Sequence, residues 1–208
     1  MSVREAYTDW STSYDSDRNL TRDLDQVVTR NTLAESRYPT ILELGCGTGK
    51  NTALLSQIGR HVYALDLTAG MIRQAQAKVR SNNVLYAVAD LTQPWPCAAR
   101  SIDLIVCNLV LEHIADLIFI FAEAQRVLVA GGHFFLCELH PFKQYQGRKA
   151  TFQRGEARTE IDAFVHHVSD FLDAAEAVGF RLNKLGEWWH EEDQDQPPRL
   201  ISLMFESS

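Results

Sequence analysis

A short run of strand character that ends in three alternating glycines constrains the fold of this chain more than any other feature. The run reads Ile41-Leu-Glu-Leu-Gly-Cys-Gly-Thr-Gly49. Glycine takes positive φ at little steric cost and has no side chain, so a ligand can come close to the backbone of such a turn. Thr48 is placed to cap a following helix, whose free N–H groups favour a polar or anionic ligand group. The stretch therefore predicts the ligand-binding turn of a Rossmann-like βαβ unit.

Strand and helix patterns alternate along most of the chain. Strands are predicted at 41–44, 61–66, 84–90, 102–107, 133–138, 180–189 and 199–206, and helices at 21–36, 48–57, from Thr68, at 116–129 before Gly131-Gly132, and from Ser169. Connections of this length allow right-handed crossovers, which predicts a mostly parallel α/β sheet covered by helices on both faces. The short gap before the last strand indicates a hairpin and one antiparallel edge strand. We expect a single domain over 1–208, with an N-terminal helical cap at 1–38 and a lid-like insertion at 139–167.

Composition and charge exclude several classes of function. The chain has 208 residues and a net charge of −7, which argues against a general nucleic-acid or acidic-membrane binder because phosphate binding needs concentrated Lys and Arg. No apolar run is long enough for a membrane span, and the start lacks a signal core. None of the four cysteines (Cys46, Cys97, Cys107, Cys137) belongs to a C-x-x-C pair. We therefore expect reduced thiols in a cytoplasmic protein, without a disulfide framework or a metal site.

Polar residues stand where the predicted strands end. In a doubly wound sheet, ligands bind outside the carboxyl ends of the strands. Asp66 ends the second strand, 21 positions after Gly45, and its carboxylate can accept hydrogen bonds from two ribose hydroxyls. Asp90 ends the third strand and can accept from an adenine amino group, while Asn108 follows the fourth. Each acid alone could equally be a solvated strand end or a helix cap, but their shared phase with the strands favours a nucleoside ligand.

Two cofactors suit this geometry. The dinucleotide fingerprint is G-x-G-x-x-G, but here the third glycine comes one residue early. Glu43, just before the turn, would also face a pyrophosphate unfavourably. A cofactor with a positive charge and no phosphate fits better, and a nicotinamide dinucleotide stays as the alternative.

The same residues carry a resemblance to a known family. Glu43-Leu-Gly-Cys-Gly-Thr-Gly49 resembles motif I of the class I S-adenosylmethionine-dependent methyltransferases. Asp66–Met71, Ala89–Leu91 and Asn108–Ile114 resemble the family's ribose-binding strand end, its adenine-binding position and the post-strand segment of its small-molecule, type 11/25-like branch. The resemblance extends over about residues 14 to 206. It implies a Rossmann-like, doubly wound, seven-stranded sheet whose last strand is antiparallel, with S-adenosylmethionine as cofactor and S-adenosylhomocysteine as product.

The resemblance also implies a role for each matching residue. Backbone of the glycine turn meets the methionine part, Glu43 helps to hold its amino-acid end, and Asn108 offers backbone near the sulfonium. Asp66 takes the ribose hydroxyls, and Tyr14 closes over the cofactor. The full set expected to bind the cofactor is Tyr14, Glu43, Gly45, Cys46, Gly47, Asp66, Leu67, Met71, Asp90, Leu91 and Asn108.

Two histidines near strand ends are candidate catalytic bases. A hydroxyl or ammonium acceptor must lose a proton during methyl transfer, so a base is useful. His113 follows the Asn108 segment, and His140 opens the segment that we expect to form the acceptor pocket. Structural roles for both stay open. His166 and His167 have no third ligand nearby in the sequence, so they predict no metal.

The segment after His140 is strongly basic. Five cations and one acid lie between residues 140 and 158 of an otherwise acidic chain. One interpretation is a lid that attracts an anionic small substrate, with Lys143 and Arg148 as the cations and Phe142 and Tyr145 as walls. The other is a solvated loop.

The sequence thus predicts a methyltransferase that acts on a small-molecule acceptor. A non-catalytic S-adenosylmethionine-binding protein is the first alternative, and an NAD(P)-dependent oxidoreductase is the second. Asn108 is followed by Leu-Val-Leu instead of Pro-Pro-aromatic, which argues against a nucleic-acid amino-methyltransferase. No pattern indicates the acceptor atom or the oligomeric state.

Overall fold

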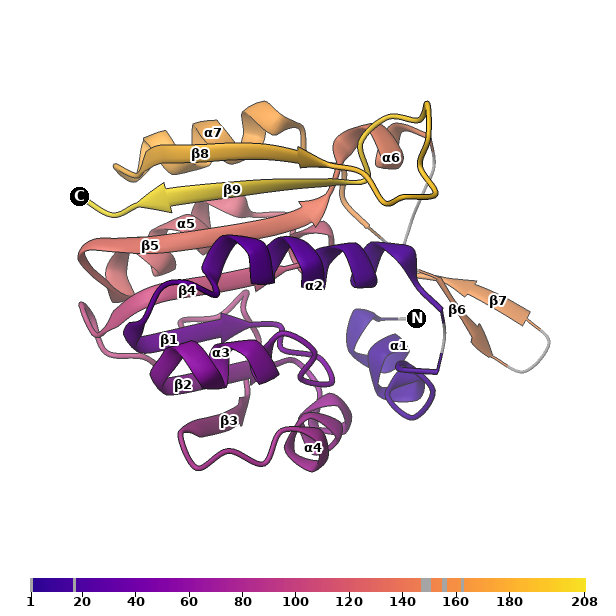
Figure 1. Ribbon diagram of the computed structural model, residues 1–208, viewed down its shortest axis with the longest axis horizontal. Coiled ribbons are helices and arrows are strands. Elements are labelled where there is room, and N and C mark those ends of the chain that lie inside the picture. The colour runs from indigo at the N-terminus through magenta and orange to yellow at the C-terminus, as the bar shows by residue number, and fades with distance from the viewer. Residues whose placement is uncertain (1, 17, 147–150, 155–156, 162) are drawn as a thin grey trace.

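The computed structural model describes residues 2–16, 18–146, 151–154, 157–161 and 163–208. Seven strands form one sheet in the order β3-β2-β1-β4-β5-β9-β8, and two more form a separate hairpin (Figure 1). The sheet strands are β1 Tyr38–Leu44, β2 Gly59–Asp66, β3 Val84–Val88, β4 Ile102–Asn108, β5 Leu128–Leu139, β8 Arg181–Trp188 and β9 Leu200–Glu206. The hairpin consists of β6 Thr151–Arg154 and β7 Ala157–Glu160.

The strand directions confirm the predicted mostly parallel sheet with an antiparallel last strand, but this strand, β9, lies between β5 and β8 and not at the edge as predicted. Strands β1 to β5 pair in parallel, and β9 is antiparallel to both of its neighbours, β5 and β8. The carboxyl ends of β1, β2 and β4 therefore meet at one edge of the sheet, with the glycine turn directly after β1.

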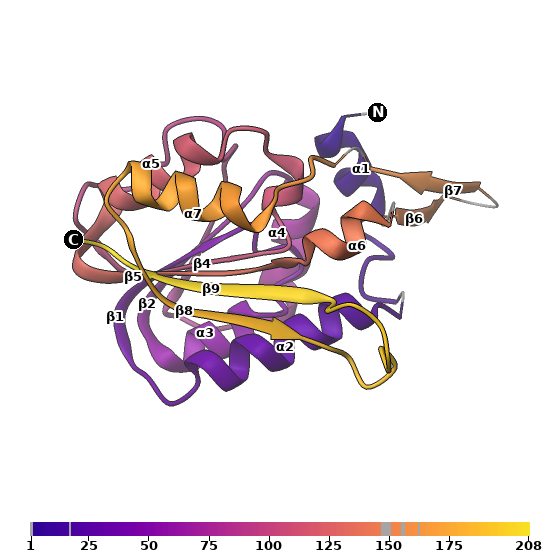
Figure 2. The same cartoon turned by 90° about the horizontal axis from the view of Figure 1, so that it is seen from above.

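Helices cover both faces of the sheet (Figure 2). They are α1 Val3–Trp10, α2 Leu20–Leu33, α3 Thr52–Ile58, α4 Ala69–Lys78, the 3-10 helix η1 Leu111–His113, α5 Leu117–Val127, α6 Pro141–Tyr145 and α7 Val168–Ala177. Side chains of α2 and α3 pack with Ile41 and Val106 on one face, and those of α5 and α7 pack with Leu42 and Ile105 on the other. The central strands are buried on both faces, which explains their continuous apolar runs.

Two details around β1 differ from the sequence predictions. Helix α3 begins at Thr52 rather than at Thr48, because the Thr48 hydroxyl lies 2.8 Å from Asp15 Oδ1 instead of capping the helix. Pro39 lies inside β1 rather than before it. Pairing of β1 with β4 starts only at Ile41, so the missing N–H of Pro39 costs no hydrogen bond on that side.

The glycine pair after α5 also has a different role. Helix α5 ends at Val127, and β5 begins at once with Leu128, so Gly131 and Gly132 lie within β5 instead of ending the helix. The register with β4 shifts here, since Ile102 pairs with Leu128 and Leu104 with His133. Gly131 has a φ of +72°, and it absorbs this bulge at little steric cost.

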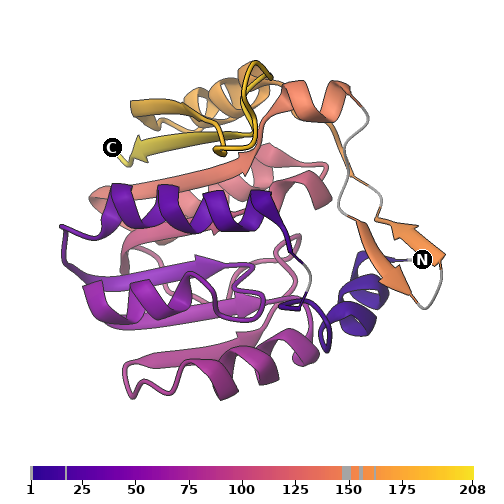
Figure 3. The ribbon, with the colours of Figure 1, turned by 45° about the vertical axis from the view of Figure 1, so that its right-hand side comes forward.

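Two further segments lie at the carboxyl edge of the sheet. Helix α1 and the hairpin β6–β7 lie side by side there, on the side opposite the C-terminus (Figures 1 and 3). Ile161, just after β7, forms a small apolar cluster with Ala6 and Trp10 of α1. The segment 139–167, expected to be lid-like, thus contains α6 and this hairpin among its described residues.

Candidate functional site

A cavity of about 450 Å³ opens at the carboxyl ends of β1, β2 and β4, beneath α1. All of the residues expected to bind the cofactor line it: Tyr14, Glu43, Gly45, Cys46, Gly47, Asp66, Leu67, Met71, Asp90, Leu91 and Asn108. The candidate base His113 lines it as well. The topology thus brings strand ends that are far apart in the sequence to one hollow.

Each position of the turn requires glycine for a different structural reason. Gly45, Gly47 and Gly49 all have positive φ, at +68°, +52° and +84°. A Cβ on Gly45 would lie 2.2 Å from the Val110 side chain, and one on Gly49 would lie 3.2 Å from the Ala75 backbone. A Cβ on Gly47 would meet no atom within 4 Å, although the residue lines the cavity. Gly47 therefore leaves open the space where a ligand can approach the backbone.

Asp66 joins the second strand to this turn. Its Oδ2 accepts a hydrogen bond from Gly47 N at 3.0 Å, and its Oδ1 accepts from Thr68 N at 2.8 Å. Thr68 also caps α4, as the sequence predicts. Burial raises the pKa of Asp66, and this effect outweighs the hydrogen bonds, which lower the pKa. Each carboxylate oxygen has a second lone pair, so Asp66 can hold the turn and still accept from a ligand hydroxyl.

Two more buried acids lie beneath the turn. Glu43 Oε2 accepts from the Thr52 hydroxyl at 2.5 Å, and burial raises the pKa of Glu43 to about 8. Asp25 of α2 accepts from Asn51 Nδ2 at 2.8 Å and from Asn108 Nδ2 at 2.7 Å, and burial raises its pKa to about 6. Asp25 was missed by sequence reasoning because it stands in mid-helix, away from any strand end.

Helix α1 covers the cavity with residues that the sequence analysis did not select. Arg4 Nη1 donates to the Leu67 carbonyl at 3.2 Å, and Arg4 Nη2 lies 3.7 Å from Asp90. Tyr7 Oη lies 2.9 Å from His113 Nε2. The Ser2 side chain and Glu5 form a capping box at the start of α1. The S-x-x-E pattern at residues 2–5 was the signal that could have revealed this helix.

Tyr14 follows α1 and stacks in an aromatic and cationic group. The guanidinium of Arg22 lies 4.0 Å from the centre of the Tyr14 ring, and the ring centres of Trp10 and Tyr14 are 4.6 Å apart. Arg22 Nη1 also donates to the Tyr14 carbonyl at 2.5 Å. These contacts hold Tyr14 at the cavity, where the sequence analysis expected it to close over a cofactor.

The described residues that were expected in an acceptor lid, namely His140, Phe142, Lys143 and Tyr145, do not line the cavity. His140 is 2% exposed, and its Nδ1 accepts from Phe142 N at 3.2 Å at the start of α6. Its Nε2 lies 3.0 Å from Glu187 Oε1, yet burial lowers the pKa of His140. This geometry corrects the expectation that His140 faces an acceptor, since both ring nitrogens are used within the fold. Phe142 and Tyr145 are about half exposed, and Arg148 lies outside the described residues.

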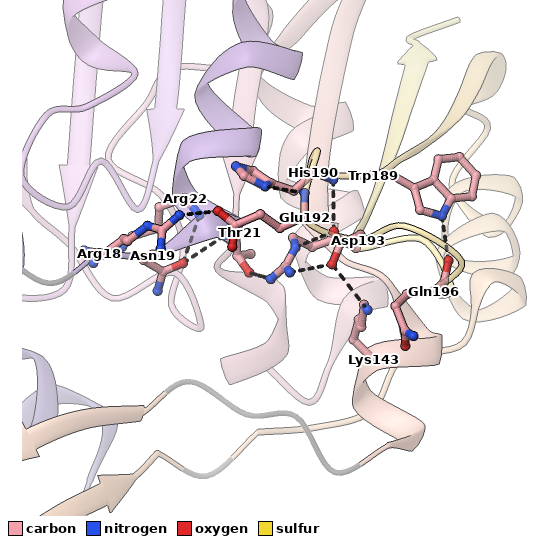
Figure 4. A network of polar contacts seen from close by, with 11 residues as sticks. Arg18, Asn19, Thr21, Arg22, Lys143, Trp189, His190, Glu192, Asp193 and Gln196 are labelled. Atoms are coloured by element: carbon pink, nitrogen blue, oxygen red, sulfur yellow. Dashed lines mark hydrogen bonds and ion pairs between the residues drawn. The ribbon is translucent and has the colours of Figure 1, made fainter.

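Lys143 has turned inward instead of toward a substrate. It is 5% exposed, and its Nζ lies 3.8 Å from Asp193 Oδ1 in the loop between β8 and β9 (Figure 4). Asp193 also accepts from Arg199, whose Nη1 reaches the Thr21 hydroxyl of α2 at 3.2 Å. The expected anion-binding role of Lys143 therefore has no geometric support, because α6 folds back onto this loop.

In the described part of the chain, no group of three or more His, Cys, Asp or Glu side chains could hold a metal ion. Nor does any helix of the described residues have the length and apolar character needed to cross a membrane.

Comparisons with known proteins agree with this geometry. Residues 42–136 match a family model described as a methyltransferase domain. The biotin biosynthesis bifunctional protein BioHC of Saccharophagus degradans is 28% identical over 204 residues, which cover 90% of this chain and 34% of that protein. The malonyl-[acyl-carrier protein] O-methyltransferase of Methylovorus sp. is 29% identical over 187 residues, covering 86% of this chain and 62% of that protein. The chain thus spans between a third and two thirds of the length of these relatives.

A solved structure shares the fold over nearly the whole chain. The S-adenosylmethionine dependent methyltransferase of Mesorhizobium loti superposes with a TM-score of 0.74 at 22% identity, covering 90% of this chain and 100% of that one. The strand order, the antiparallel β9 and the glycine turn above acidic strand ends agree with the fold that the resemblance to the class I S-adenosylmethionine-dependent methyltransferases implies. This chain is similar to that class, and its match to the methyltransferase domain model covers residues 42–136. S-adenosylmethionine is the cofactor of the class.

Proposed function

We propose that this protein transfers the methyl group of S-adenosylmethionine to a small-molecule acceptor. The observation that carries the proposal is the single cavity in which the glycine turn meets three buried acids, Asp25, Glu43 and Asp66. A ligand with positive charge would lower the raised pKa values of Asp25 and Glu43 and stabilise their carboxylates, whereas a pyrophosphate would raise these pKa values further. The same observation disfavours a nicotinamide dinucleotide.

The cofactor, when bound, supplies an activated methyl group on a sulfonium. The chain's own residues bind the cofactor, orient it and the acceptor, and exclude water. The open backbone at Gly47 and the hydroxyl acceptor Asp66 are assigned to the methionine and ribose parts. Asp90 and Leu91 are assigned to the adenine edge, and Leu67 and Met71 to its faces. Alignment of this kind can lower a barrier by about 7–11 kcal/mol, and a hydroxyl or ammonium acceptor must in addition lose a proton.

The acceptor is assigned to the end of the cavity beside η1. Tyr7, Tyr14, His113 and Ile114 line that end, whereas residues 138–146 do not. We therefore assign α1 and η1, rather than α6, as the walls of the acceptor pocket. His113 is the candidate base, because it is the one histidine among the cavity's described lining residues. The four free thiols agree with a cytoplasmic location.

Calorimetry tests the cofactor, and a transfer assay tests the activity. We expect S-adenosylhomocysteine to bind in the micromolar range and NADH not to bind; the reverse result would remove the proposal. Purified protein with methyl-labelled S-adenosylmethionine and a metabolite extract should then label a small molecule, and Asp66→Ala should abolish labelling. Tight cofactor binding without labelling of any fraction would favour the non-catalytic alternative.

A further inference from the structure

Tyr7 and His113 meet across the cavity although they are 106 positions apart in the chain. Tyr7 Oη lies 2.9 Å from His113 Nε2, and the two rings meet edge to face with centres 5.4 Å apart. Both residues line the cavity at the end assigned to the acceptor. Tyr7 comes from the covering helix α1 and His113 from η1, so the contact exists only while α1 is in place.

The protonation state of Tyr7 and the tautomer of His113 together set the direction of this hydrogen bond. Burial raises the pKa of Tyr7 well above its usual value, and the nearby Tyr14, Glu112 and Asp66 raise it further. Arg22 opposes them. Tyr7 therefore stays a phenol, which can donate to Nε2 when His113 is the tautomer protonated at Nδ1.

Glu112 lies behind this pair. Its Oε1 is 3.8 Å from His113 Nε2, its side chain is 9% exposed, and burial raises its pKa to about 7. Its Oε2 has no hydrogen-bond partner among the described residues. A proton gained by His113 would place an imidazolium 3.8 Å from the Glu112 carboxyl group, and the imidazolium and a Glu112 carboxylate would stabilise each other.

The segment before α7 fixes the position of η1. Phe164 N donates to the Glu112 carbonyl at 2.7 Å. Nε2 of the buried His166 lies 3.1 Å from the Leu111 carbonyl and 2.8 Å from that of Ile114. These bonds brace both ends of η1, so Glu112 and His113 are held in place independently of any ligand.

We propose that Tyr7 and His113 form a proton relay for a hydroxyl-bearing acceptor, with Glu112 as a positioning residue. The acceptor O–H gives its proton to Tyr7 Oη while the phenol proton of Tyr7 moves to His113 Nε2. The acceptor oxygen forms its bond to the methyl carbon as the carbon–sulfur bond breaks, and that electron pair stays on sulfur. The positive charge thereby passes from the sulfonium to the imidazolium beside Glu112.

The relay indicates the chemical class of the acceptor. A carboxylate acceptor has no proton to lose, whereas an alcohol or a phenol does. Tyr14 and Ile114 beside the relay offer aromatic and apolar surface, which favours a neutral phenol. This inference rests on the proposed function, since it uses the same cavity and cofactor.

Nitrogen NMR of the His113 ring tests the relay without knowledge of the acceptor. The sample is the full chain with S-adenosylhomocysteine bound, at pH 7.5, with His113→Gln to assign the signal. We expect the tautomer protonated at Nδ1, and a shifted Nε2 signal in Tyr7→Phe. A tautomer protonated at Nε2, or a signal that does not respond to Tyr7→Phe, overturns the relay. Failure of S-adenosylhomocysteine to bind would instead overturn the proposed function.

A rate measurement is the second test of the relay. With the labelled acceptor fraction as substrate, Tyr7→Phe should lower kcat by about 10²–10⁴-fold and leave the KM for the cofactor within about twofold. Glu112→Gln should lower kcat less and shift the pH profile. Tyr63→Phe, on the exposed face of β2, is the matched control and should change neither quantity. Unchanged kcat in Tyr7→Phe contradicts the relay even if methyl transfer itself is confirmed.

Discussion

The carboxylate of Asp193 faces the guanidinium of Arg199 through two hydrogen bonds, from Nε to Oδ2 at 2.7 Å and from Nη2 to Oδ1 at 2.5 Å. Asp193 is 4% exposed, and the ammonium of Lys143 lies on its other side. The pair ties the loop between β8 and β9 to α2 through Thr21 and to α6 through Lys143 (Figure 4). This loop is thus fastened at the same edge of the sheet as the cavity.

Asp193→Asn should therefore destabilise the fold. Removing one partner of a buried ion pair leaves the other charge uncompensated, which costs about 3–5 kcal/mol. Burial raises the pKa of Asp193, but the bonds from Arg199 and His190 outweigh it and hold the pKa below the usual range. The stabilisation should be present above the unfolded-state pKa and be lost as pH falls through the folded-state value. Urea unfolding of both proteins at pH 7 and pH 3 measures this.

Lys143→Met separates a structural role of Lys143 from a role in substrate binding. Because the ammonium is buried beside Asp193, we expect a lower unfolding free energy and an unchanged KM for the acceptor. Lys184→Met, on the exposed surface of β8, is the control for charge removal. A raised KM with unchanged stability would restore the anion-binding role that the sequence suggested.

Gly47→Ala should weaken cofactor binding more than it weakens the fold. The new methyl group would project into open space in the cavity, at a backbone φ of +52°. Gly131→Ala is a matched control, because it also has positive φ and open space but lies in β5, outside the cavity lining. Both variants should lose about 1 kcal/mol of stability from backbone strain. Only Gly47→Ala should raise the dissociation constant of S-adenosylhomocysteine. We expect an increase of about tenfold or more, which corresponds to a loss of binding free energy of about 1.4 kcal/mol.

Glu43 should make stability fall as pH rises. Its pKa of about 8 in the folded state lies above the ordinary value of 4.5. Between these two values the folded state binds the extra proton, so raising the pH costs about 1.4 kcal/mol per unit at most. Glu43→Gln keeps an acceptor for Thr52 and should flatten this dependence. Thermal unfolding of both proteins from pH 5 to pH 9 measures the difference, and parallel curves would contradict the shifted pKa.

Asp66→Asn should release the glycine turn as well as a ligand hydroxyl. Hydrogen bonds to a charged group contribute about 1.5–3 kcal/mol each, so we expect a loss of cofactor affinity of at least about tenfold. Asp103→Asn is the control, because Asp103 also accepts from a backbone N–H, that of Thr40, at 2.9 Å but at the opposite end of β4. Equal effects of the two substitutions on S-adenosylhomocysteine binding would show that Asp66 acts only through general stability.

The sheet and the cofactor end of the cavity could be predicted because their signals are local. The central strands β1, β4 and β5 contain short apolar runs, Asp66 ends β2, and Asp90 follows the end of β3 by two residues, so the parallel topology brings the two acids to one edge of the sheet. The glycine turn is equally local, since Gly45 and Gly47 take positive φ within one short stretch.

The acceptor end could not be predicted in the same way. No periodic pattern in the sequence indicates that Tyr7 contacts His113, because this contact depends on how α1 packs over η1. Asp25 looks like any polar residue of an amphipathic helix until Asn51 and Asn108 are placed around it. His140 does follow a strand end, but its use as the cap of α6 decides where its ring points.

The position of β9 has a consequence for how the chain folds. In the sheet, β8 has β9 as its one hydrogen-bonding neighbour, and β9 in turn is inserted between β5 and β8. Strand β8 therefore cannot pair within this sheet until β9 is available. Strand β9 in turn pairs with β5, which ends about 60 residues before β9 begins. Because non-local strand pairing is slow, we expect docking of this last hairpin to limit the rate of refolding, with β1 to β5 already assembled.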